Sequence, residues 1–220
     1  AIINDDLINV FRKKKYLSKL ILLKYRDYKK IKLKINNIYL SSRANDENMN
    51  FVYTLAKKLN ISDNSFIKSM NSFKGLFHRY EIFLKKHGVT FINDSKATSL
   101  QSSKFALASS KNIYWIVGGL PKAKDKIDLN NVKNNIIKSY IIGKNISFFK
   151  KQLENKVKFT INRTLRNAVI SILKEIELSN NKKNVILLSP GAASFDQYKN
   201  FENRGNEFKK LSKLYAKKFI

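Results

Sequence analysis

The chain has 220 residues, in which 44 Lys and Arg stand against 16 Asp and Glu, so its formal net charge is +28. It is 43% hydrophobic and has no Cys, which excludes a disordered basic tail, disulfide bonds and thiolate metal sites. The longest apolar run, about residues 113–120, is far shorter than the roughly 18 residues of a membrane span, and no signal peptide is visible. We therefore expect a globular, soluble, cytoplasmic protein that does not enter a membrane.

The high positive charge admits two interpretations. A basic nucleic-acid-binding module would carry such a charge. However, 37 of the cations are Lys and only 7 are Arg, and Lys, Asn and Ile, which all have A/T-rich codons, make up 88 of the 220 residues. Proteins that read nucleic acids favour Arg, whose planar group matches phosphates and base edges. The codon explanation is therefore favoured, no nucleic acid is expected as partner, and the nucleic-acid-binding module stays as the alternative.

The first 75 residues give a mixed pattern. Residues 1–6 have the pattern of a strand that runs into a turn. The stretches 20–23 and 30–40 alternate apolar residues with Lys, as strands with one exposed face do. Residues 48–59 and 63–73 have helical spacing, and Asp63 is the expected cap of the second helix. Gly75 follows this helix, and a domain boundary is expected there. Because the chain opens inside a strand and at Ala1 rather than Met, it is also expected to be a piece of a longer protein.

The rest of the chain alternates short apolar runs with helical patterns. The expected strands are residues 80–85, 89–92, 113–117, 140–142, 156–159 and 184–188, with His87-Gly88 as a hairpin turn between the first two. The expected helices are residues 99–109, 146–153, 164–178 and 203–217. This alternation predicts an α/β fold whose open sheet is mostly parallel and has helices on both faces. In such sheets ligands bind beyond the carboxyl ends of the strands.

One loop after a predicted strand has the residues of an anion site. Residues 91–98 run into the helix that starts near residue 99, and the N-terminus of a helix favours phosphate or carboxylate. Lys96 and Thr98 add a cation and a hydroxyl there, and Asp94 could accept from a ribose hydroxyl. On spacing alone, a capped helix start with a nearby Lys explains this loop as well.

Three further loops are candidates for the same site. They are Gly118-Gly119 with Lys122, residues 189–201 with Ser194, and His78-Arg79 at the domain boundary. Taken alone, each of these loops can also be explained as a turn or connection without a ligand. Together with the first loop they suit an anionic amino acid beside a nucleotide phosphate. A dinucleotide-dependent oxidoreductase is disfavoured because no G-x-G-x-x-G loop occurs.

Several of these segments carry a resemblance to a known family. They are Leu-Phe-His-Arg-Tyr-Glu at 76–81, Asn-Asp-Ser-Lys-Ala-Thr at 93–98, Gly118-Gly119 with Lys122, and Ser-Phe-Asp-Gln-Tyr-Lys-Asn-Phe-Glu-Asn-Arg-Gly at 194–205. They resemble the Mur ligases, and in particular the branch that adds D-glutamate. The resemblance covers residues 76–220 and, more loosely, residues 1–75. It implies that residues 1–76 are the last part of a central ATP-binding domain, whose P-loop does not occur here, and that residues 77–220 are a Rossmann-like, amino-acid-binding C-terminal domain.

The resemblance also implies an activity. Members of this branch are ADP-forming acid–D-amino-acid ligases that join D-glutamate to UDP-N-acetylmuramoyl-L-alanine through an acyl phosphate, a step of peptidoglycan synthesis and so of cell-wall growth and division. It implies ATP and Mg²⁺ as cofactors, with most Mg²⁺ ligands outside this chain and none assigned within it. The implied partners are these small molecules, and the full-length protein is expected to be a monomer. A piece without the P-loop is expected to be inactive alone.

Residue roles follow from the same resemblance. Thr98, Lys122, Ser194, Phe195 and Phe201 would hold D-glutamate, with Lys122 as the counter-charge that selects an acidic amino acid. The residues that would contact ATP are Asn45, Asn48, Arg79 and Asp94. Lys96 and Arg79 are the expected catalytic cations, with Lys96 near the phosphates. Ala44 stands where the family's nucleotide motif usually has a His.

Overall fold

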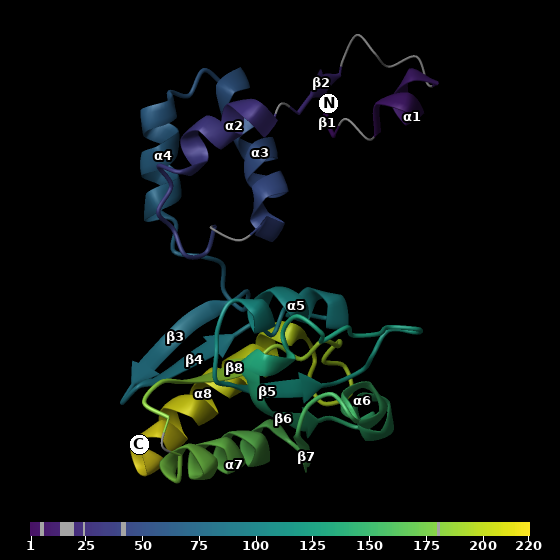
Figure 1. The fold of residues 1–220 in the computed structure, drawn as a ribbon, viewed down its shortest axis with the longest axis vertical. Helices are drawn as coiled ribbons and strands as arrows, with labels where there is room; N and C mark the ends of the chain where they lie inside the picture. The colour runs from purple at the N-terminus through teal and green to yellow at the C-terminus, as the bar shows by residue number, and fades with distance from the viewer. Residues whose placement is uncertain (5–6, 14–19, 24, 41–42, 180) are drawn as a thin grey trace. The chain divides into compact units, whose positions relative to one another are not determined.

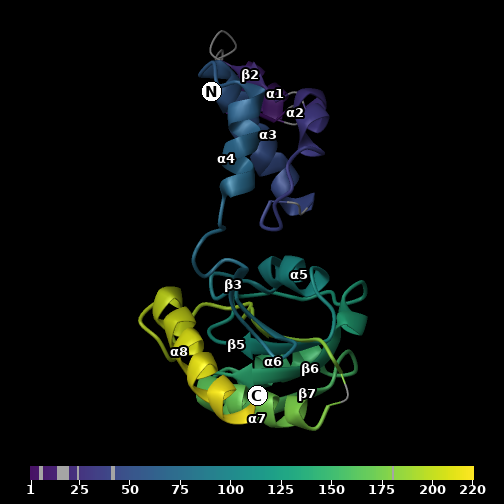
Figure 2. The same cartoon turned by 90° about the vertical axis from the view of Figure 1, so that its left-hand side faces the viewer.

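The computed structural model describes residues 1–4, 7–13, 20–23, 25–40, 43–179 and 181–220. They form two compact units, Ala1–Lys74 (unit 1) and Gly75–Ile220 (unit 2), which are drawn in Figures 1 and 2. Each unit has its own buried core, so each is described by itself.

Unit 1 consists mainly of helices. Its elements are β1 (Ile2–Ile3), α1 (Ile8–Arg12), β2 (Ile21–Leu22), α2 (Tyr25–Lys32), α3 (Arg43–Lys58) and α4 (Asp63–Ser72). β1 and β2 pair in parallel, which confirms a strand within residues 1–6 and another within 20–23, while residues 5–6, where the turn was predicted, lie outside the described residues. The core of the unit is formed by side chains of the last three helices, Tyr28, Ile31, Met49, Tyr53, Ala56 and Phe66.

The strand predicted over residues 30–40 is wrong. α2 continues to Lys32, and Tyr28 and Ile31, which are three residues apart, both face the core. Leu33 is 93% exposed and Ile38 is 58% exposed, so the apolar residues of this stretch do not share one buried face. The alternation of Lys with apolar residues therefore imitates the period of a strand without forming one.

The second helix of the prediction is confirmed, but its cap is a different residue. Ser62 is the N-cap of α4, and its side chain accepts a hydrogen bond from the backbone N–H of Ser65. The Asp63 carboxylate accepts instead from the Tyr53 hydroxyl and from Lys57, at 2.9 and 3.1 Å. Asp63 therefore links α3 to α4 rather than capping α4.

Unit 2 is built on a six-stranded sheet. The strands are β3 (Glu81–Lys86), β4 (Val89–Asn93), β5 (Ile113–Gly118), β6 (Ile136–Ile142), β7 (Phe159–Arg163) and β8 (Asn184–Leu188), in the order β3-β4-β8-β5-β6-β7. Only β3 runs antiparallel to its neighbour in this sheet, and His87-Gly88 makes the hairpin turn that leads to β4. The α/β fold with a mostly parallel sheet is therefore confirmed.

Helices cover both faces of the sheet, as Figures 1 and 2 show. They are α5 (Leu100–Ala108), α6 (Ile146–Leu153), α7 (Leu165–Glu177) and α8 (Phe201–Phe219). In β5, Ile113, Trp115 and Val117 pack with α5 and α6, whereas Tyr114 and Ile116 pack with α7 and α8. This is the alternation that a strand buried on both faces produces.

Two strands differ from their predicted bounds by more than one residue at an end. β6 begins at Ile136, four residues before the predicted start, and β7 begins at Phe159 where the prediction ended. The N–H groups of Lys156 and Val157 both donate to the Leu153 carbonyl, at 3.0 and 3.2 Å. The chain is therefore still turning after α6 at the residues predicted to be a strand.

The parallel strands place their carboxyl ends at one edge of the sheet. β4, β8 and β5 are neighbours, and the loops that follow them begin at residues 94, 189 and 119. These are three of the four loops selected from the sequence. None of the helices within the described residues is long and apolar enough to cross a membrane.

Candidate functional site

Asp94 joins the first and third of these loops. The Ser189 hydroxyl donates to its Oδ2 at 2.7 Å, and the Tyr80 backbone N–H donates to its Oδ1 at 3.1 Å. Its own N–H donates to the Leu188 carbonyl at 2.8 Å. Both carboxylate oxygens are thus engaged by the chain itself, and Asp94 holds the ends of β4 and β8 together.

The buried position of Asp94 changes its acidity. Burial raises the pKa of Asp94 to about 6, although the hydrogen bonds from Ser189 and Tyr80 act in the opposite direction. The carboxyl group therefore titrates not far below neutral pH. The role toward ATP that the sequence predicts for Asp94 stays a prediction.

Arg204 of α8 is a buried residue that connects the first and third loops by hydrogen bonds. It is 1% exposed, and its Nε donates to the Ser95 hydroxyl at 3.0 Å. Its Nη2 donates to the carbonyls of Ser95 and Ala192, at 2.9 and 3.0 Å. Burial lowers the pKa of Arg204 to about 10, so it stays charged at neutral pH.

The Arg204 side chain also faces the second loop. Its Nη1 has no hydrogen-bond partner among the described residues. A Cβ added at Gly119 would lie 3.1 Å from this nitrogen. No role was predicted for Arg204, although the sequence carries a signal of its burial. Arg204, Phe208 and Leu211 have helical spacing, which places a charge on the buried face of α8.

The two glycines of the second loop are required by the chain's own packing. Gly118 and Gly119 have φ values of 138° and 135°. A Cβ at Gly118 would lie 2.0 Å from the Ile142 carbonyl oxygen, and one at Gly119 would lie 2.3 Å from the Ala193 carbonyl oxygen. Backbone atoms of the neighbouring segments therefore approach both glycines closely.

The second and third loops are paired through their backbones. The Leu120 N–H donates to the Ala193 carbonyl at 2.8 Å, and the Ala193 N–H donates to the Leu120 carbonyl at 3.0 Å. Lys122 is exposed two residues after this pair, while Ser194 is buried and Phe195 is 69% exposed directly after it. The loops that carry three of the five residues predicted for D-glutamate therefore touch.

The other two predicted D-glutamate residues lie at helix starts on the same edge. Thr98 is half-buried two residues before α5, and Phe201 is half-buried as the first residue of α8. The Phe201 carbonyl accepts from the Ser95 hydroxyl at 2.8 Å, which ties the start of α8 to the first loop.

Lys96, one of the predicted catalytic cations, lies over an aromatic ring. Its Nζ is 4.9 Å from the centre of the Phe201 ring, whose edge meets the His78 ring at a centre distance of 6.0 Å. The structure thus brings Lys96 and Phe201 together. Arg79, the other predicted cation, is exposed next to His78.

His78 is a buried member of a polar cluster. Its Nδ1 is 2.9 Å from the Asn93 Nδ2, and the same amide group donates to Glu81 at 3.0 Å. Burial lowers the pKa of His78, so the ring is neutral at pH 7 and its Nδ1 can accept from Asn93. This cluster fixes the backbone that presents Arg79 and Lys96.

The residues predicted for ATP lie in both units. Asn45 and Asn48 are on α3 of unit 1, where the Asn45 amide donates to the Tyr39 carbonyl at 2.8 Å and Asn48 is exposed. Arg79 and Asp94 are in unit 2. The role of each of these residues toward ATP remains a prediction. Within the described residues, no three side chains of His, Asp or Glu lie together as metal ligands.

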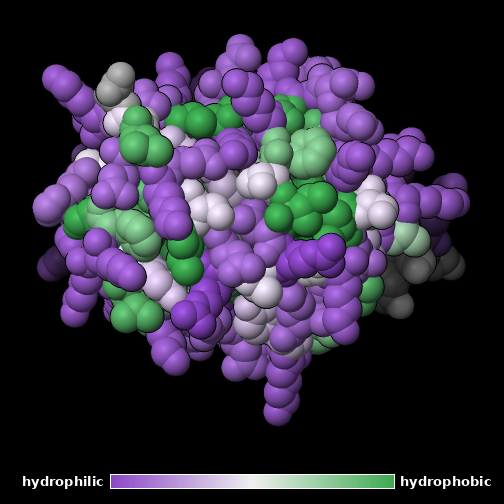
Figure 3. Space-filling model, turned by 90° about the horizontal axis from the view of Figure 1, so that it is seen from below, coloured by the Kyte–Doolittle hydropathy of each residue, from purple (hydrophilic) through white to green (hydrophobic). Residues whose placement is uncertain are grey.

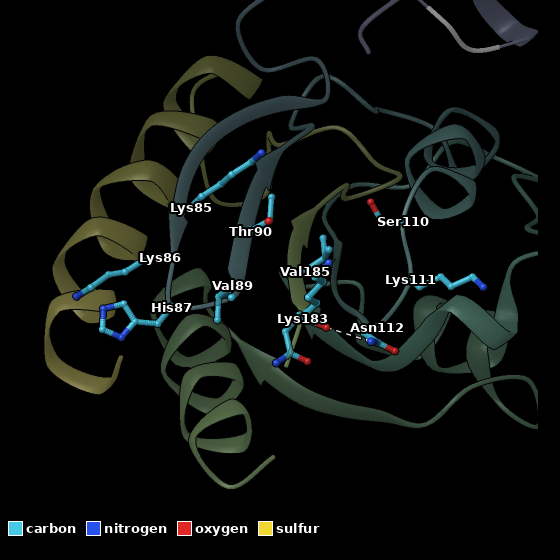
Figure 4. A pocket seen from close by; sticks show the side chains of 12 residues that line it. Lys85, Lys86, His87, Val89, Thr90, Ser110, Lys111, Asn112, Lys183 and Val185 are labelled. Carbon is cyan, nitrogen blue, oxygen red and sulfur yellow. Dashed lines mark hydrogen bonds between the residues drawn. The ribbon is translucent and has the colours of Figure 1, made fainter. Parts of the chain in front are cut away.

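A cavity of about 640 Å³ lies at the opposite edge of the sheet, where β4, β8 and β5 begin. Figure 4 shows its lining, in which Lys86 and Lys111 point to opposite sides. The Lys86 Nζ donates to the Ala216 carbonyl at 3.0 Å and so does not face the cavity. These lysines do not converge on a ligand, and the cavity is not the candidate site.

The surface shows hydrophilic and apolar residues in alternation. Figure 3 shows hydrophilic side chains across the whole of one face, with separate apolar patches among them. Lysines pair with carboxylates at scattered places, for example Lys104 with Asp128 and Lys138 with Glu175, at 3.1 and 2.6 Å. These two lysines of unit 2 are thus paired with carboxylates at separate places.

The chain was compared with protein-family models, with curated proteins and with solved structures. No protein-family model matches the chain. A UDP-N-acetylmuramoylalanine–D-glutamate ligase of Wolbachia sp. subsp. Brugia malayi is 39% identical over 189 residues, 83% of this chain and 38% of that protein. The ligase of the same name from Agrobacterium fabrum is 42% identical over 148 residues, 67% of this chain and 32% of that protein. The chain thus spans between about a third and two fifths of these relatives.

Solved structures agree in fold. The MurF ligase of Thermotoga maritima, in complex with ADP, covers 78% of this chain with a TM-score of 0.52 and 14% identity. MurF of Acinetobacter baumannii covers the same share with a TM-score of 0.57 and 16% identity. At such identities the likeness concerns the fold alone. Over the segment that its relatives match, this chain belongs to the Mur ligase family, and its named relatives there are UDP-N-acetylmuramoylalanine–D-glutamate ligases.

Proposed function

We propose that the chain is part of an ATP-dependent ligase that joins D-glutamate to UDP-N-acetylmuramoyl-L-alanine, in the cytoplasmic synthesis of peptidoglycan precursors. The observation that carries the proposal is the 39% identity to relatives with that name over 83% of the chain. It is supported by the loops after β4, β5 and β8, which meet at one edge of the sheet. Unit 1 would be the last part of the ATP-binding domain and unit 2 the amino-acid-binding domain.

The proposed reaction has two steps. A carboxylate is a poor electrophile, so a carboxylate oxygen of the first substrate takes the γ-phosphoryl group of ATP, and ADP leaves. The amine nitrogen of D-glutamate then attacks the acyl carbon, loses a proton and expels inorganic phosphate. The product is an amide, and one ADP and one phosphate are formed for each bond.

The chain's residues have distinct tasks in this proposal. Lys122 is exposed at the carboxyl edge and would pair with a carboxylate of D-glutamate, and hydroxyl groups of Thr98 and Ser194 would orient the amino acid. Lys96, held over the Phe201 ring, would reach the transferring phosphoryl group. Arg79 and Asp94 would contact ATP together with Asn45 and Asn48. Mg²⁺, when bound, would neutralise negative charge on the phosphates. The described residues bring no three His, Asp or Glu side chains together to hold it.

Lys122 gives the sharpest test of these assignments. We would place unit 2 in the Agrobacterium fabrum ligase in exchange for the matching segment, and measure the KM of this chimaera for each substrate. Lys122→Ala should raise the KM for D-glutamate about 10- to 100-fold, because a hydrogen bond to a charged group is worth about 1.5–3 kcal/mol. The KM for ATP should stay within about twofold, since the amino-acid site alone loses a contact.

Lys126→Ala is the matched control. Lys126 is exposed on the same loop, and its removal changes the net charge by the same amount. Its KM for D-glutamate should equal that of the unsubstituted chimaera. An equal rise in the two variants, or an equal loss for both substrates in Lys122→Ala, would show that Lys122 does not hold D-glutamate.

A further inference from the structure

We propose that Asp125 is a positioning residue for D-glutamate, which fixes the loop carrying Lys122 against the start of α5, beside Thr98. The inference rests on the proposed function. It assigns a task to a carboxylate that does not itself contact the amino acid.

The loop that carries Lys122 is held at two points. At its beginning, Leu120 is paired with Ala193 of the third loop by two backbone hydrogen bonds of 2.8 and 3.0 Å. At its far end, the Asp125 Oδ2 accepts from the Leu100 N–H at 2.8 Å. Lys122 lies between these two points and is exposed. The Asp125 carboxylate therefore ties the second half of the loop to the start of α5.

The partner of Asp125 is the first N–H group of α5. The Ser99 hydroxyl accepts from the Ser102 N–H, which leaves the Leu100 N–H for another acceptor. A carboxylate is favoured at this position by the positive end of the helix dipole. The sequence predicted an external anion at this helix start, but the Leu100 N–H is already bound to the chain's own carboxylate. Thr98 and Lys122 flank this contact.

Asp125 is also coupled to Lys122 through the backbone. The Asp125 N–H donates to the Lys122 carbonyl at 3.2 Å, which closes a turn between the two residues. Behind the turn, Gln152 of α6 accepts from the Ile127 N–H at 3.2 Å and donates to the Asp125 carbonyl at 3.4 Å. Ile127 is buried in the core, which anchors the segment that follows Asp125, so we expect the loss of the Leu100 contact to displace the side of the turn that carries Lys122.

The test compares Asp125→Ala with Asp125→Asn in the same chimaera. In Asp125→Ala the contact to Leu100 is lost, so the KM for D-glutamate should rise at least about 10-fold while the KM for ATP changes less than about twofold. In Asp125→Asn the side-chain oxygen still accepts from Leu100, and the KM for D-glutamate should stay within about threefold. Rescue by Asn, together with the split between the two KM values, distinguishes positioning from a general loss of structure.

Asp128→Ala is the matched control. Asp128 lies on the same segment and pairs with Lys104 of the same helix, at 3.1 Å, but on the exposed surface. Such exposed pairs contribute about 0–1 kcal/mol, so its KM values should not change. If Asp125→Ala unfolds the chimaera, Asp125→Glu takes its place, because the longer side chain keeps the charge but displaces the loop, and the same rise is expected.

Two results would overturn the inference: an unchanged KM for D-glutamate in Asp125→Ala, or an equal rise in Asp125→Asn. The Lys122→Ala variant separates these results from a failure of the proposed function. If Lys122→Ala raises the KM for D-glutamate and Asp125→Ala does not, only the positioning role is wrong. If neither variant changes it, the proposed amino-acid site is wrong as well.

Discussion

At the scale of single residues, the carboxyl edge of the sheet is held by buried polar side chains. Asp94 binds the ends of β4 and β8, and Arg204 binds the carbonyls of Ser95 and Ala192 on the first and third loops. Because a buried polar group that loses its partner costs about 1–3 kcal/mol, these contacts fix the loops in one arrangement. The exposed cations Lys96 and Lys122 are thereby presented on a rigid support.

The first residue-scale prediction concerns pH. The pKa of Asp94 is about 6 in the folded protein, above the value of about 3.9 for Asp in an unfolded chain. Between these values the folded state binds more protons, so the contribution of Asp94 to the free energy of unfolding falls as the pH rises from about 4 to 6. Asp94→Asn does not titrate and should lack this fall.

Urea denaturation of the 220-residue chain at pH 4 and pH 7 measures the effect. At each pH, the free energy of unfolding of the natural sequence is subtracted from that of Asp94→Asn. This difference should be larger at pH 7 than at pH 4, by at most about 3 kcal/mol. Comparison with the unsubstituted chain removes the contributions of the other carboxylates. A difference that does not depend on pH would mean that Asp94 is not a buried, weakly acidic group.

At the scale of elements, α8 packs closely on the end of β4. A Cβ added at Gly205 would lie 2.2 Å from the His78 Nδ1 and 2.9 Å from the side-chain atoms of Asn93. Gly205→Ala should therefore lower the free energy of unfolding by about 1–3 kcal/mol, although Ala is about 1 kcal/mol better than Gly inside a helix. Asn206→Ala, at the exposed neighbouring position, should leave it unchanged or slightly higher.

Thermal and urea unfolding of the two variants decide this point. If Gly205→Ala proves as stable as Asn206→Ala, the helix does not approach His78 as closely as described. A loss confined to Gly205→Ala shows that the helix must lie against the polar cluster of His78 and Asn93.

The elements also show how far the sequence determines the structure. β8 and α6 have the predicted bounds, because one is an uninterrupted apolar strand and the other has clear helical spacing. The strand predicted over residues 30–40 is wrong because Lys and apolar residues alternate there, but the apolar residues do not share one buried face. Asp125 and Arg204 had no predicted role. Helical spacing indicates that Arg204 is buried, but Leu100 and Ser95, which Asp125 and Arg204 contact, lie 25 and 109 residues away, and no local pattern identifies such distant partners.

At the scale of the whole molecule, the charge of +28 and the candidate site are separate features. Lysines occur throughout the sequence, and in the cavity lined by Lys85, Lys86, Lys111 and Lys183 the side chains of Lys86 and Lys111 point to opposite sides. The proposal assigns roles to three of the chain's cations, Arg79, Lys96 and Lys122. The net charge is therefore no argument for or against the proposed reaction.

The central claim is that unit 2 supplies the D-glutamate site of an ATP-dependent ligase. The most direct test is the product formed by the chimaera that carries unit 2, incubated with UDP-N-acetylmuramoyl-L-alanine, ATP and D-glutamate. Mass spectrometry and an ADP assay should find the amide product with one ADP for each bond formed, and no product when D-glutamate is left out. A chimaera that unfolds cooperatively, and so is folded, but forms neither product nor ADP would contradict the account.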